Sequence, residues 1–169
     1  MKKIFDVAGN FSFKLAQKEV NNRQLSELLA YLRAAYHVNQ SHHWQTNGDE
    51  FYADHLLFQR IYEEGQPFID DVAERAVGLG TTSSVDALNQ IDATAKLVHK
   101  VYEMAPGESP DDMINRSLAV EQMVLDKIKS SIDELEAYNG LTHGVSNLLE
   151  GIADKHETFI YLLKRRSTK

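Results

Sequence analysis

The stretch FYADHLLFQRIYEEGQPFIDDVAERAVGLG, residues 51–80, carries a helical repeat along most of its length. Its apolar residues recur every three or four positions and make one face of a helix; they are Leu57, Phe58, Ile61, Phe68, Ile69 and Val72. Asp49 is a plausible N-terminal cap, and Gly80 closes the run. Pro67 removes one backbone hydrogen bond and clashes with the carbonyl four residues earlier, so we expect a kink there. The stretch predicts one long helix that bends near its middle.

Two polar pairs lie on the other side of this expected helix. His55 and Gln59 are four residues apart, as are Asp70 and Glu74, so the members of each pair are neighbours on a helical surface. At about 100° per residue, these side chains fall within roughly 100° of one another, whereas the apolar face is centred about 260° from His55. Such a stripe is commonly a solvated face, but Leu56 shares it, which fits an interface better. The pattern alone leaves both interpretations open.

The two pairs are too far apart to bind one ion. Asp70 lies 15 residues beyond His55, which is about 22 Å along a straight helix, and less if the helix bends at Pro67. If these side chains belong to a metal site, the other half of that site must come from a second copy of the chain. The sequence therefore predicts an oligomer with a site at its interface.

A further candidate ligand, His43, comes from the preceding helical run. That run has an apolar stripe with His43 at its centre; the stripe comprises Leu25, Leu28, Leu29, Leu32, Tyr36 and Asn39. We expect this helix to begin at a cap formed by Asn21 or Asn22 and to end at Gly48. His43 precedes His55 by only 12 residues, so an antiparallel hairpin can bring the two rings together. A histidine alone on such a stripe is more often a core residue, but together with the two polar pairs it favours a metal site.

The rest of the chain predicts a helical bundle. A short helix is expected over residues 85–97. Ser109 and Pro110, followed by two aspartates, form a strong start for a third long helix that reaches Gly140. The last long helix has one face made of Val145, Leu148, Leu149, Ile152, His156, Phe159, Ile160 and Leu163. Four long amphipathic helices, with a small helix between the second and the third, make an all-α bundle with one crossover.

Composition limits the function further. The chain is 43% hydrophobic and 25% charged, and we expect one domain over residues 1–169 with short tails at about 1–20 and 165–169. It has no cysteine, which excludes disulfides, thiolate metal sites and cysteine catalysis. No apolar run is long enough to span a membrane, and the start of the sequence lacks the pattern of a secretory signal. We therefore expect a cytoplasmic protein.

The net charge of −7 favours metal cations over nucleic acid as partners. Basic residues nevertheless cluster at the end of the chain, where they could contact DNA phosphates; they are Lys164, Arg165, Arg166 and Lys169. Solvated terminal charge is the simpler interpretation of this cluster. We expect at most weak binding to DNA through it.

Imidazole and carboxylate ligands suit iron, zinc, manganese and copper. A ferritin-type centre within one subunit uses a Glu-x-x-His pattern, and none of the seven histidines has a glutamate three positions before it. A two-metal centre inside one bundle is therefore not expected. His42 points about 100° away from His43 on a helix, so we expect it to be structural or at the surface. His156, on the apolar face of the last helix, is expected in the core.

Several motifs, in this order and spacing, resemble the signature of the Dps family, the DNA-binding proteins of starved cells. They are His43-Trp44, Gly48, Phe51, His55, the run Asp70-Asp71-Val72-Ala73-Glu74-Arg75, Leu79-Gly80 and the later run Ile152-Ala153-Asp154-Lys155-His156-Glu157. The resemblance covers most of the chain. It implies a ferritin-like four-helix bundle that assembles as a hollow homododecamer, in a cytoplasmic location that can include the nucleoid.

The resemblance also implies a site and a function. A two-iron (Fe) ferroxidase centre would lie at the two-fold interface, with His43 and His55 from one subunit and Asp70 and Glu74 from its mate. Proteins of this family oxidise Fe(II) with hydrogen peroxide or oxygen and store ferric mineral inside the shell, which protects DNA from oxidative damage. These four side chains would be both metal ligands and catalytic residues.

The chain departs from the family pattern at several positions. Gln59 stands where the family usually has an aspartate, so we expect one iron position to be weakened. Leu56 replaces a frequent glutamate, and Thr142, His143 and Asn147 stand where the family has acidic pore residues. Two alternatives stay open: a Dps-like shell with a degraded centre that acts as a structural or DNA-coating protein, and a site that binds zinc or copper.

Overall fold

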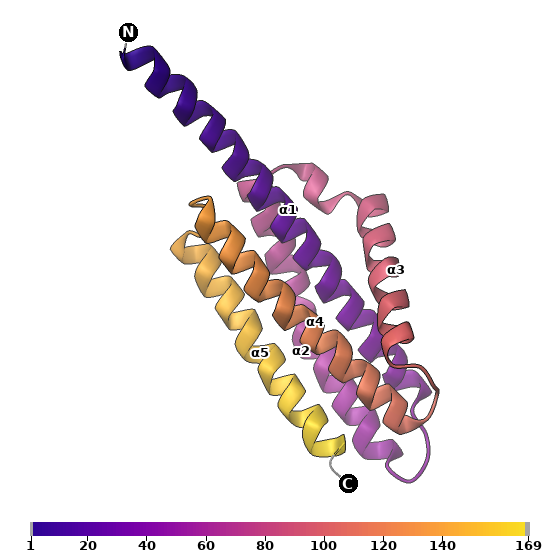
Figure 1. Cartoon of the computed structure of the whole chain (residues 1–169). Helices are drawn as coiled ribbons and strands as arrows, with labels where there is room; N and C mark the ends of the chain where they lie inside the picture. Colours follow the sequence, from indigo (N-terminus) through magenta and orange to yellow (C-terminus); the bar gives the residue numbers. More distant parts are fainter. Residues whose placement is uncertain (1, 168–169) are drawn as a thin grey trace.

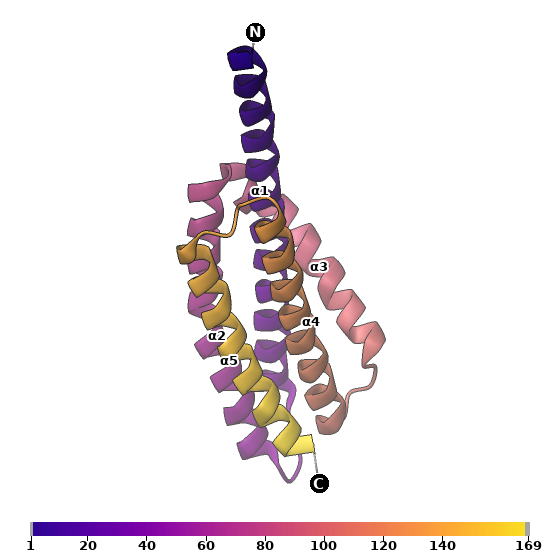
Figure 2. The ribbon, with the colours of Figure 1, turned by 60° about the vertical axis from the view of Figure 1, so that its left-hand side comes forward.

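The computed structural model describes the backbone of residues 2–167 and the side chains of residues 12–167. Within that part, five α-helices and one 3-10 helix form: α1 (Lys2–Gln45), α2 (Phe51–Leu79), η1 (Thr82–Val85), α3 (Ala87–Met104), α4 (Pro110–Ala137) and α5 (His143–Ser167). Helices α1, α2, α4 and α5 run side by side as a bundle, and α3 lies outside it (Figures 1 and 2). The predicted all-α architecture, with four long helices and one further helix between the second and the third, is confirmed.

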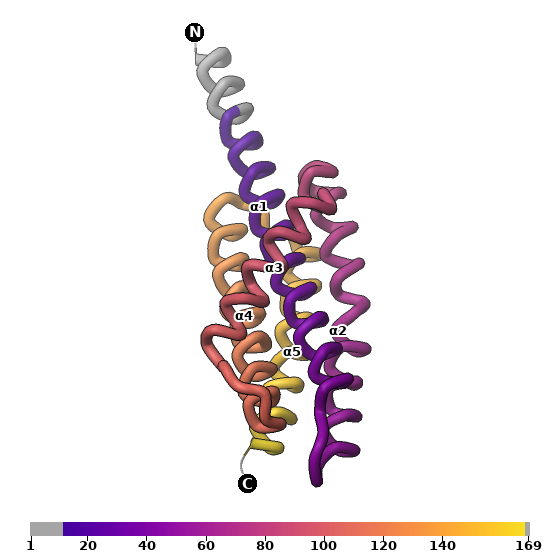
Figure 3. Tube along the Cα trace, turned by 90° about the vertical axis from the view of Figure 1, so that its right-hand side faces the viewer, coloured from indigo at the N-terminus to yellow at the C-terminus, as the bar shows by residue number. Residues whose placement is uncertain are grey.

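Helix α3 forms the single long crossover. The chain leaves α2 at one end of the bundle. Helix α3 packs against α1 and takes the chain back to the other end, where α4 begins (Figure 3). Helices α2 and α4 are consequently parallel. The small helix expected over residues 85–97 is longer than predicted, because α3 continues to Met104 with Gln90, Thr94 and Val101 buried on its inner face.

The apolar faces that the sequence predicted form the core. Members from the four long helices are at most 2% exposed; they include Leu25, Leu28, Leu29, Leu32, Val72, Val124, Leu135, Leu149 and Ile152. A second buried cluster comprises Phe58, Ile61, Met113, Ile114, Phe159 and Leu163. Removal of these side chains from water is the main force that holds the four long helices together.

The first helix begins much earlier than the sequence predicted. α1 starts at Lys2, so the expected cap at Asn21 or Asn22 is wrong, and the expected N-terminal tail is part of a helix. Asn21 is buried, and the Oδ1 of Asn22 accepts hydrogen bonds from Thr81 (3.0 Å) and Ser84. These side chains make tertiary contacts and therefore do not end the helix. The N-terminal part of α1 extends past the other bundle helices (Figure 1).

A five-residue connection turns the chain from α1 into α2. Gly48, with a φ of 86°, lies in this connection, and its left-handed backbone favours glycine. α1 has already ended at Gln45, and Glu50 precedes α2 without a capping side-chain hydrogen bond, so the prediction that Asp49 caps the helix is wrong. α2 then runs through Pro67 without a break.

The start of α4 follows the prediction closely. Ser109 Oγ accepts a hydrogen bond from the backbone N–H of Asp112 (3.1 Å), and Asp112 Oδ2 accepts one from the backbone N–H of Ser109 (3.0 Å). This capping box satisfies two backbone donors that a helix start leaves unpaired. The hydrogen bonds from Ser109 lower the pKa of the Asp112 carboxyl.

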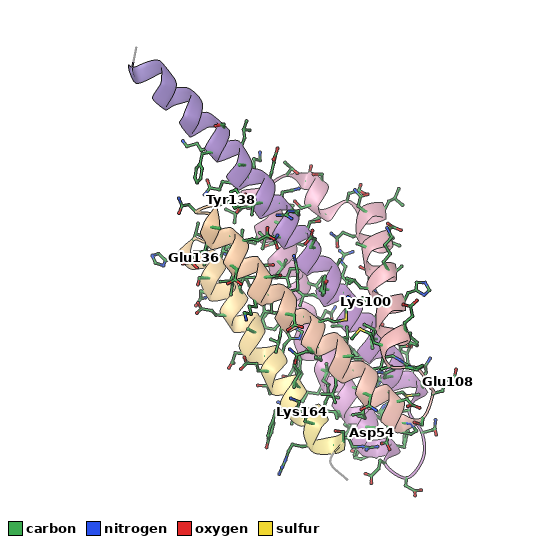
Figure 4. The ribbon with its side chains drawn as sticks, viewed as in Figure 1. Asp54, Lys100, Glu108, Glu136, Tyr138 and Lys164 are labelled. Atoms are coloured by element: carbon green, nitrogen blue, oxygen red, sulfur yellow. The ribbon has the colours of Figure 1, made fainter. Side chains whose placement is uncertain are left out.

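The C-terminal end of α5 is fastened to the bundle. Arg166 donates from Nε to Asp54 Oδ1 (2.6 Å) and from Nη2 to Asp54 Oδ2 (2.9 Å), and its Nη1 bonds Asp111 Oδ1 (3.0 Å). Asp54 is fully buried, at the end of the bundle where α5 finishes (Figure 4). Arg166, one of the basic residues that could contact DNA, thus has its guanidinium bound to two carboxylates, so the interpretation of it as solvated terminal charge is wrong. Lys169 lies outside the described residues.

Three polar side chains meet in the middle of the bundle. Glu121 of α4 is fully buried; its Oε1 accepts a hydrogen bond from Asn39 Nδ2 (2.8 Å), and its Oε2 bonds His156 Nδ1. His156 is a core residue, as predicted. With one carboxylate and one imidazole, this group has too few ligands for a two-metal centre.

Glu121→Ala should lower the free energy of unfolding by about 3–5 kcal/mol, because His156 and Asn39 then stay buried without their charged partner. Urea denaturation at one protein concentration measures the change. Glu136→Ala, on the exposed side of the same helix, should change it by less than about 0.5 kcal/mol. Equal midpoints for the two variants would contradict a structural role of the buried group.

Candidate metal centre

His43 and His55 face each other across the α1–α2 connection. His43 lies in the last turn of α1, and His55 lies in the second turn of α2. Their rings are stacked, with centroids 3.8 Å apart and planes at 25°. The predicted hairpin does bring the two histidines together.

Two reciprocal hydrogen bonds fix the orientation of both rings. The Nδ1 of His43 lies 3.0 Å from the backbone oxygen of His55, and the Nδ1 of His55 lies 2.8 Å from the backbone oxygen of His43. Because a carbonyl oxygen only accepts, each Nδ1 must carry the hydrogen. The lone pair of each neutral ring is then on Nε2. Histidines that bind metals are commonly held in this way, with one ring nitrogen bonded to a carbonyl and the other on the metal.

Aromatic rings surround the histidine pair. Tyr62 meets His43 edge to face at 5.4 Å, and Phe51 lies 5.1 Å from His55. Both imidazoles are half-buried. Trp44, by contrast, is exposed and does not cover the pair within the described chain. The two rings are thus held by packing on one side and open on another.

The acidic pair lies elsewhere on α2. Asp70 and Glu74 are both exposed and make no hydrogen bond or ion pair within the described residues. Asp70 lines a groove between α1 and α2 with Arg33 and His37, and Glu74 lines another between α2 and α5. The structure therefore does not bring the acidic pair to the histidines.

One chain does not form a metal site by itself. Among residues 12–167, no three His, Cys, Asp or Glu side chains are grouped so that they could hold an ion. The helix between His55 and Asp70 is continuous, so about 22 Å of rise separates the two halves. The residues present nevertheless have the chemistry for iron, since nitrogen and carboxylate oxygen are both suitable ligands.

Comparison with known proteins identifies the family. The sequence pattern of the ferritin-like domain matches residues 22–166. The nutrient stress-induced DNA-binding protein of Nostoc sp. is 30% identical over 141 residues, which are 82% of this chain and 72% of that protein. This chain belongs to the ferritin-like family, in its Dps branch.

Solved Dps structures share the fold. DpsC from Streptomyces coelicolor superposes with a TM-score of 0.78 at 22% identity, over 91% of this chain and 87% of that one. A Dps protein from Vibrio cholerae O1, described as a member of a broad superfamily of ferritin-like diiron-carboxylate proteins, superposes with a TM-score of 0.72 at 20% identity, over 89% and 90%. No helix in the described part of this Dps-branch chain is long and apolar enough to cross a membrane.

Gln59, at the position of the usual Dps aspartate, makes a contact that the sequence analysis missed. Its Nε2 donates a hydrogen bond to Glu63 Oε1 (2.8 Å), one helical turn further along α2. The i, i+4 spacing of the two residues was the available signal, since such pairs meet on a helix surface. The amide of Gln59 is therefore held by a carboxylate.

His42 is a structural residue of this Dps-branch bundle. It is fully buried, its Nδ1 bonds Ser117 Oγ (2.9 Å), and its Nε2 lies 3.3 Å from Nη1 of Arg116. Because Arg116 only donates, Nε2 accepts and the hydrogen is on Nδ1. Burial, and then the charge of Arg116, lower the pKa of His42 to about 3. The prediction of a structural role is confirmed.

The low pKa of His42 should make the fold less stable toward acid. In the unfolded chain this histidine takes up a proton near its ordinary pKa of about 6.5. In the folded chain it stays neutral until the pH approaches its lowered pKa of about 3. The contribution of neutral His42 to the free energy of unfolding is thus present above pH 6.5, and about 1.5 kcal/mol of it should be lost between pH 6.5 and 5. Urea unfolding at both pH values measures this loss. In His42→Gln the free energy of unfolding should fall by about 1.5 kcal/mol less over the same range. Equal losses in the two proteins would contradict the assignment.

Proposed function

We propose that this chain assembles with further copies of itself and oxidises Fe(II) at two-iron centres between subunits. His43 and His55 of one subunit, and Asp70 and Glu74 of its mate, hold the iron. The observation that carries the proposal is the split geometry: two imidazoles with Nε2 available, and two unpaired carboxylates that the same rigid helix keeps away from them. A two-fold axis would complete two such sites at once, because each subunit offers both halves.

Exposed apolar side chains support an interface on this part of the molecule. Leu56 and Val77, on the same stripe of α2 as the candidate ligands, are exposed. Leu88 and Ile91 of α3 are 78% and 63% exposed. Exposed apolar side chains of this kind favour contact with another protein surface. A second copy would both cover them and supply the missing ligands, and a homododecamer is the assembly that the family resemblance implies.

The ligand chemistry fits iron as a substrate. Neutral imidazoles bind Fe(II), and carboxylates favour the more highly charged Fe(III), so the ligand set promotes oxidation. With hydrogen peroxide the balance is two Fe(II), one H₂O₂ and two protons giving two Fe(III) and two waters; oxygen is the alternative oxidant. Consumption of iron and peroxide together, followed by storage of ferric mineral, would protect DNA from the radicals that the two otherwise produce.

Purified protein should accelerate Fe(II) oxidation, and each half of the site should be needed. His43→Ala/His55→Ala and Asp70→Ala/Glu74→Ala should each slow oxidation by about tenfold or more, since each removes half of the ligands. Stopped-flow absorbance of Fe(III) formation, with peroxide and separately with oxygen, measures the rate. Asp133→Ala/Glu136→Ala, an exposed acidic pair on α4, is the control and should match the wild type. Full activity in either ligand variant would remove the proposed centre.

Gln59 favours a second candidate function, in which the centre does not oxidise iron. The centre would then bind zinc or copper, or it would be a degraded site in a shell that acts as a structural or DNA-coating protein. An amide in place of a carboxylate removes one negative charge and makes the site less specific for iron. Metal analysis of protein purified without added iron distinguishes the candidates. Stoichiometric zinc or copper, together with slow Fe(II) oxidation in the wild type, would favour the second one.

DNA binding should be weak at physiological salt. The body carries a net charge of −7, and Arg166, one of the four basic candidates, is bound to Asp54 and Asp111. Repetition of Lys164 and Arg165 on every subunit adds some avidity. We expect gel retardation of DNA at low salt that disappears at about 150 mM salt, and that Lys164→Ala/Arg165→Ala reduces it. A tight complex at physiological salt would contradict this expectation.

A further inference from the structure

The hydrogen bond between Gln59 and Glu63 determines which way the Gln59 amide faces. Its Nε2 donates to Glu63 Oε1 over 2.8 Å. The reverse orientation would set the amide oxygen against a carboxylate, and two acceptors cannot bond each other. The amide nitrogen is therefore directed along α2 toward Glu63, and the amide oxygen is on the other branch of the same planar group.

The amide oxygen is the atom of Gln59 that can bind a metal ion, because the amide nitrogen has no available lone pair. Within the described residues no hydrogen bond is made to Gln59 Oε1. Gln59 lies four residues after His55, which is about 6 Å of helical rise. The contact with Glu63 thus leaves Oε1 available, on a residue one helical turn after His55.

The charge of Glu63 is not neutralised by a neighbouring cation. Arg60, on the same helix, pairs with Glu64 (2.9 Å), and Lys155 of α5 pairs with Glu64 as well (3.0 Å). Among the described residues no cation forms an ion pair with Glu63.

We propose that Glu63 is a positioning residue for the iron position next to His55. It holds the Gln59 amide so that Oε1 can bind Fe(II). It also supplies the negative charge that Gln59 lacks, one helical turn further along α2. Gln59 and Glu63 together then take the place of a single aspartate. This inference rests on the proposed function. It assigns to Glu63 a role at the iron site although Glu63 is not itself an iron ligand.

An ordinary surface pair on a helix is the competing explanation. A hydrogen bond at i, i+4 between exposed side chains contributes only about 0.2–0.5 kcal/mol to helix stability. Such a pair would affect unfolding slightly and would not affect iron. The two explanations therefore differ in Fe(II) affinity.

Anaerobic Fe(II) titration of the assembled protein, followed by steady-state oxidation, tests the proposal. Glu63→Ala removes both the acceptor and the charge, and should weaken the second Fe(II) equivalent and raise the KM for Fe(II) about tenfold, with kcat changed much less. Glu63→Gln keeps an acceptor and should recover part of the loss. The urea midpoint should stay within error of the wild type. Glu103→Ala, an exposed carboxylate on α3, is the matched control and should have no effect.

The Gln59→Asp background makes the test specific. An aspartate there binds iron directly, so Glu63→Ala should change Fe(II) affinity less than about twofold in that background. Unchanged affinity in Glu63→Ala alone, or an equal loss in both backgrounds, would overturn the role of Glu63 while leaving the interface centre in place. Wild-type protein that binds no Fe(II) would overturn the proposed function, and this inference with it.

Discussion

The rigid separation of two ligand pairs on one helix governs the proposed chemistry. His55 and Asp70 share α2, which is continuous from Phe51 to Leu79. A helix of this kind keeps its residues at a fixed spacing, so no rearrangement of side chains can close the gap between them. In the proposal, two copies related by a two-fold axis would solve the problem, because each would present its histidines to the acidic residues of the other. Metal binding would then depend on assembly.

The packing of the bundle serves this arrangement. The short α1–α2 connection brings His43 to His55, and the reciprocal hydrogen bonds to backbone carbonyls leave both Nε2 atoms for a ligand. The interior of the bundle takes no part in the proposed centre: Glu121 bonds both Asn39 and His156 there. The candidate ligands are therefore at the surface of the bundle, where a second subunit could reach them.

Local patterns predicted most of the fold. Helical repeats located the four long helices, and the Ser109 cap followed by Pro110 marked the start of α4 to the residue. The failures have a common cause. Asn21 and Asn22 have the composition of a helix cap but make tertiary contacts, and Arg166 resembles a free basic residue but binds Asp54, 112 residues away. A single sequence without the fold does not reveal contacts over such distances.

The spacing of the sequence nominated His43, His55, Asp70 and Glu74 as candidate ligands. The structure brings the two histidines together, and within the described residues it keeps the acidic pair apart from them, as helix length predicted. The hydrogen bonds that fix the imidazoles are made to backbone oxygens. Because every residue type has a backbone oxygen, no sequence pattern predicts these bonds. The Gln59–Glu63 contact, in contrast, follows from i, i+4 spacing and could have been anticipated.

Mixed assemblies test the shared site most directly. His43→Ala/His55→Ala and Asp70→Ala/Glu74→Ala chains, each expected to be slow alone, would be unfolded, mixed in equal amounts and refolded together. Random pairing across a two-fold axis rebuilds one intact centre in each mixed dimer, so about a quarter of the wild-type Fe(II) oxidation rate should return. Mixed particles that form but stay as slow as their parents would contradict a centre built from two subunits.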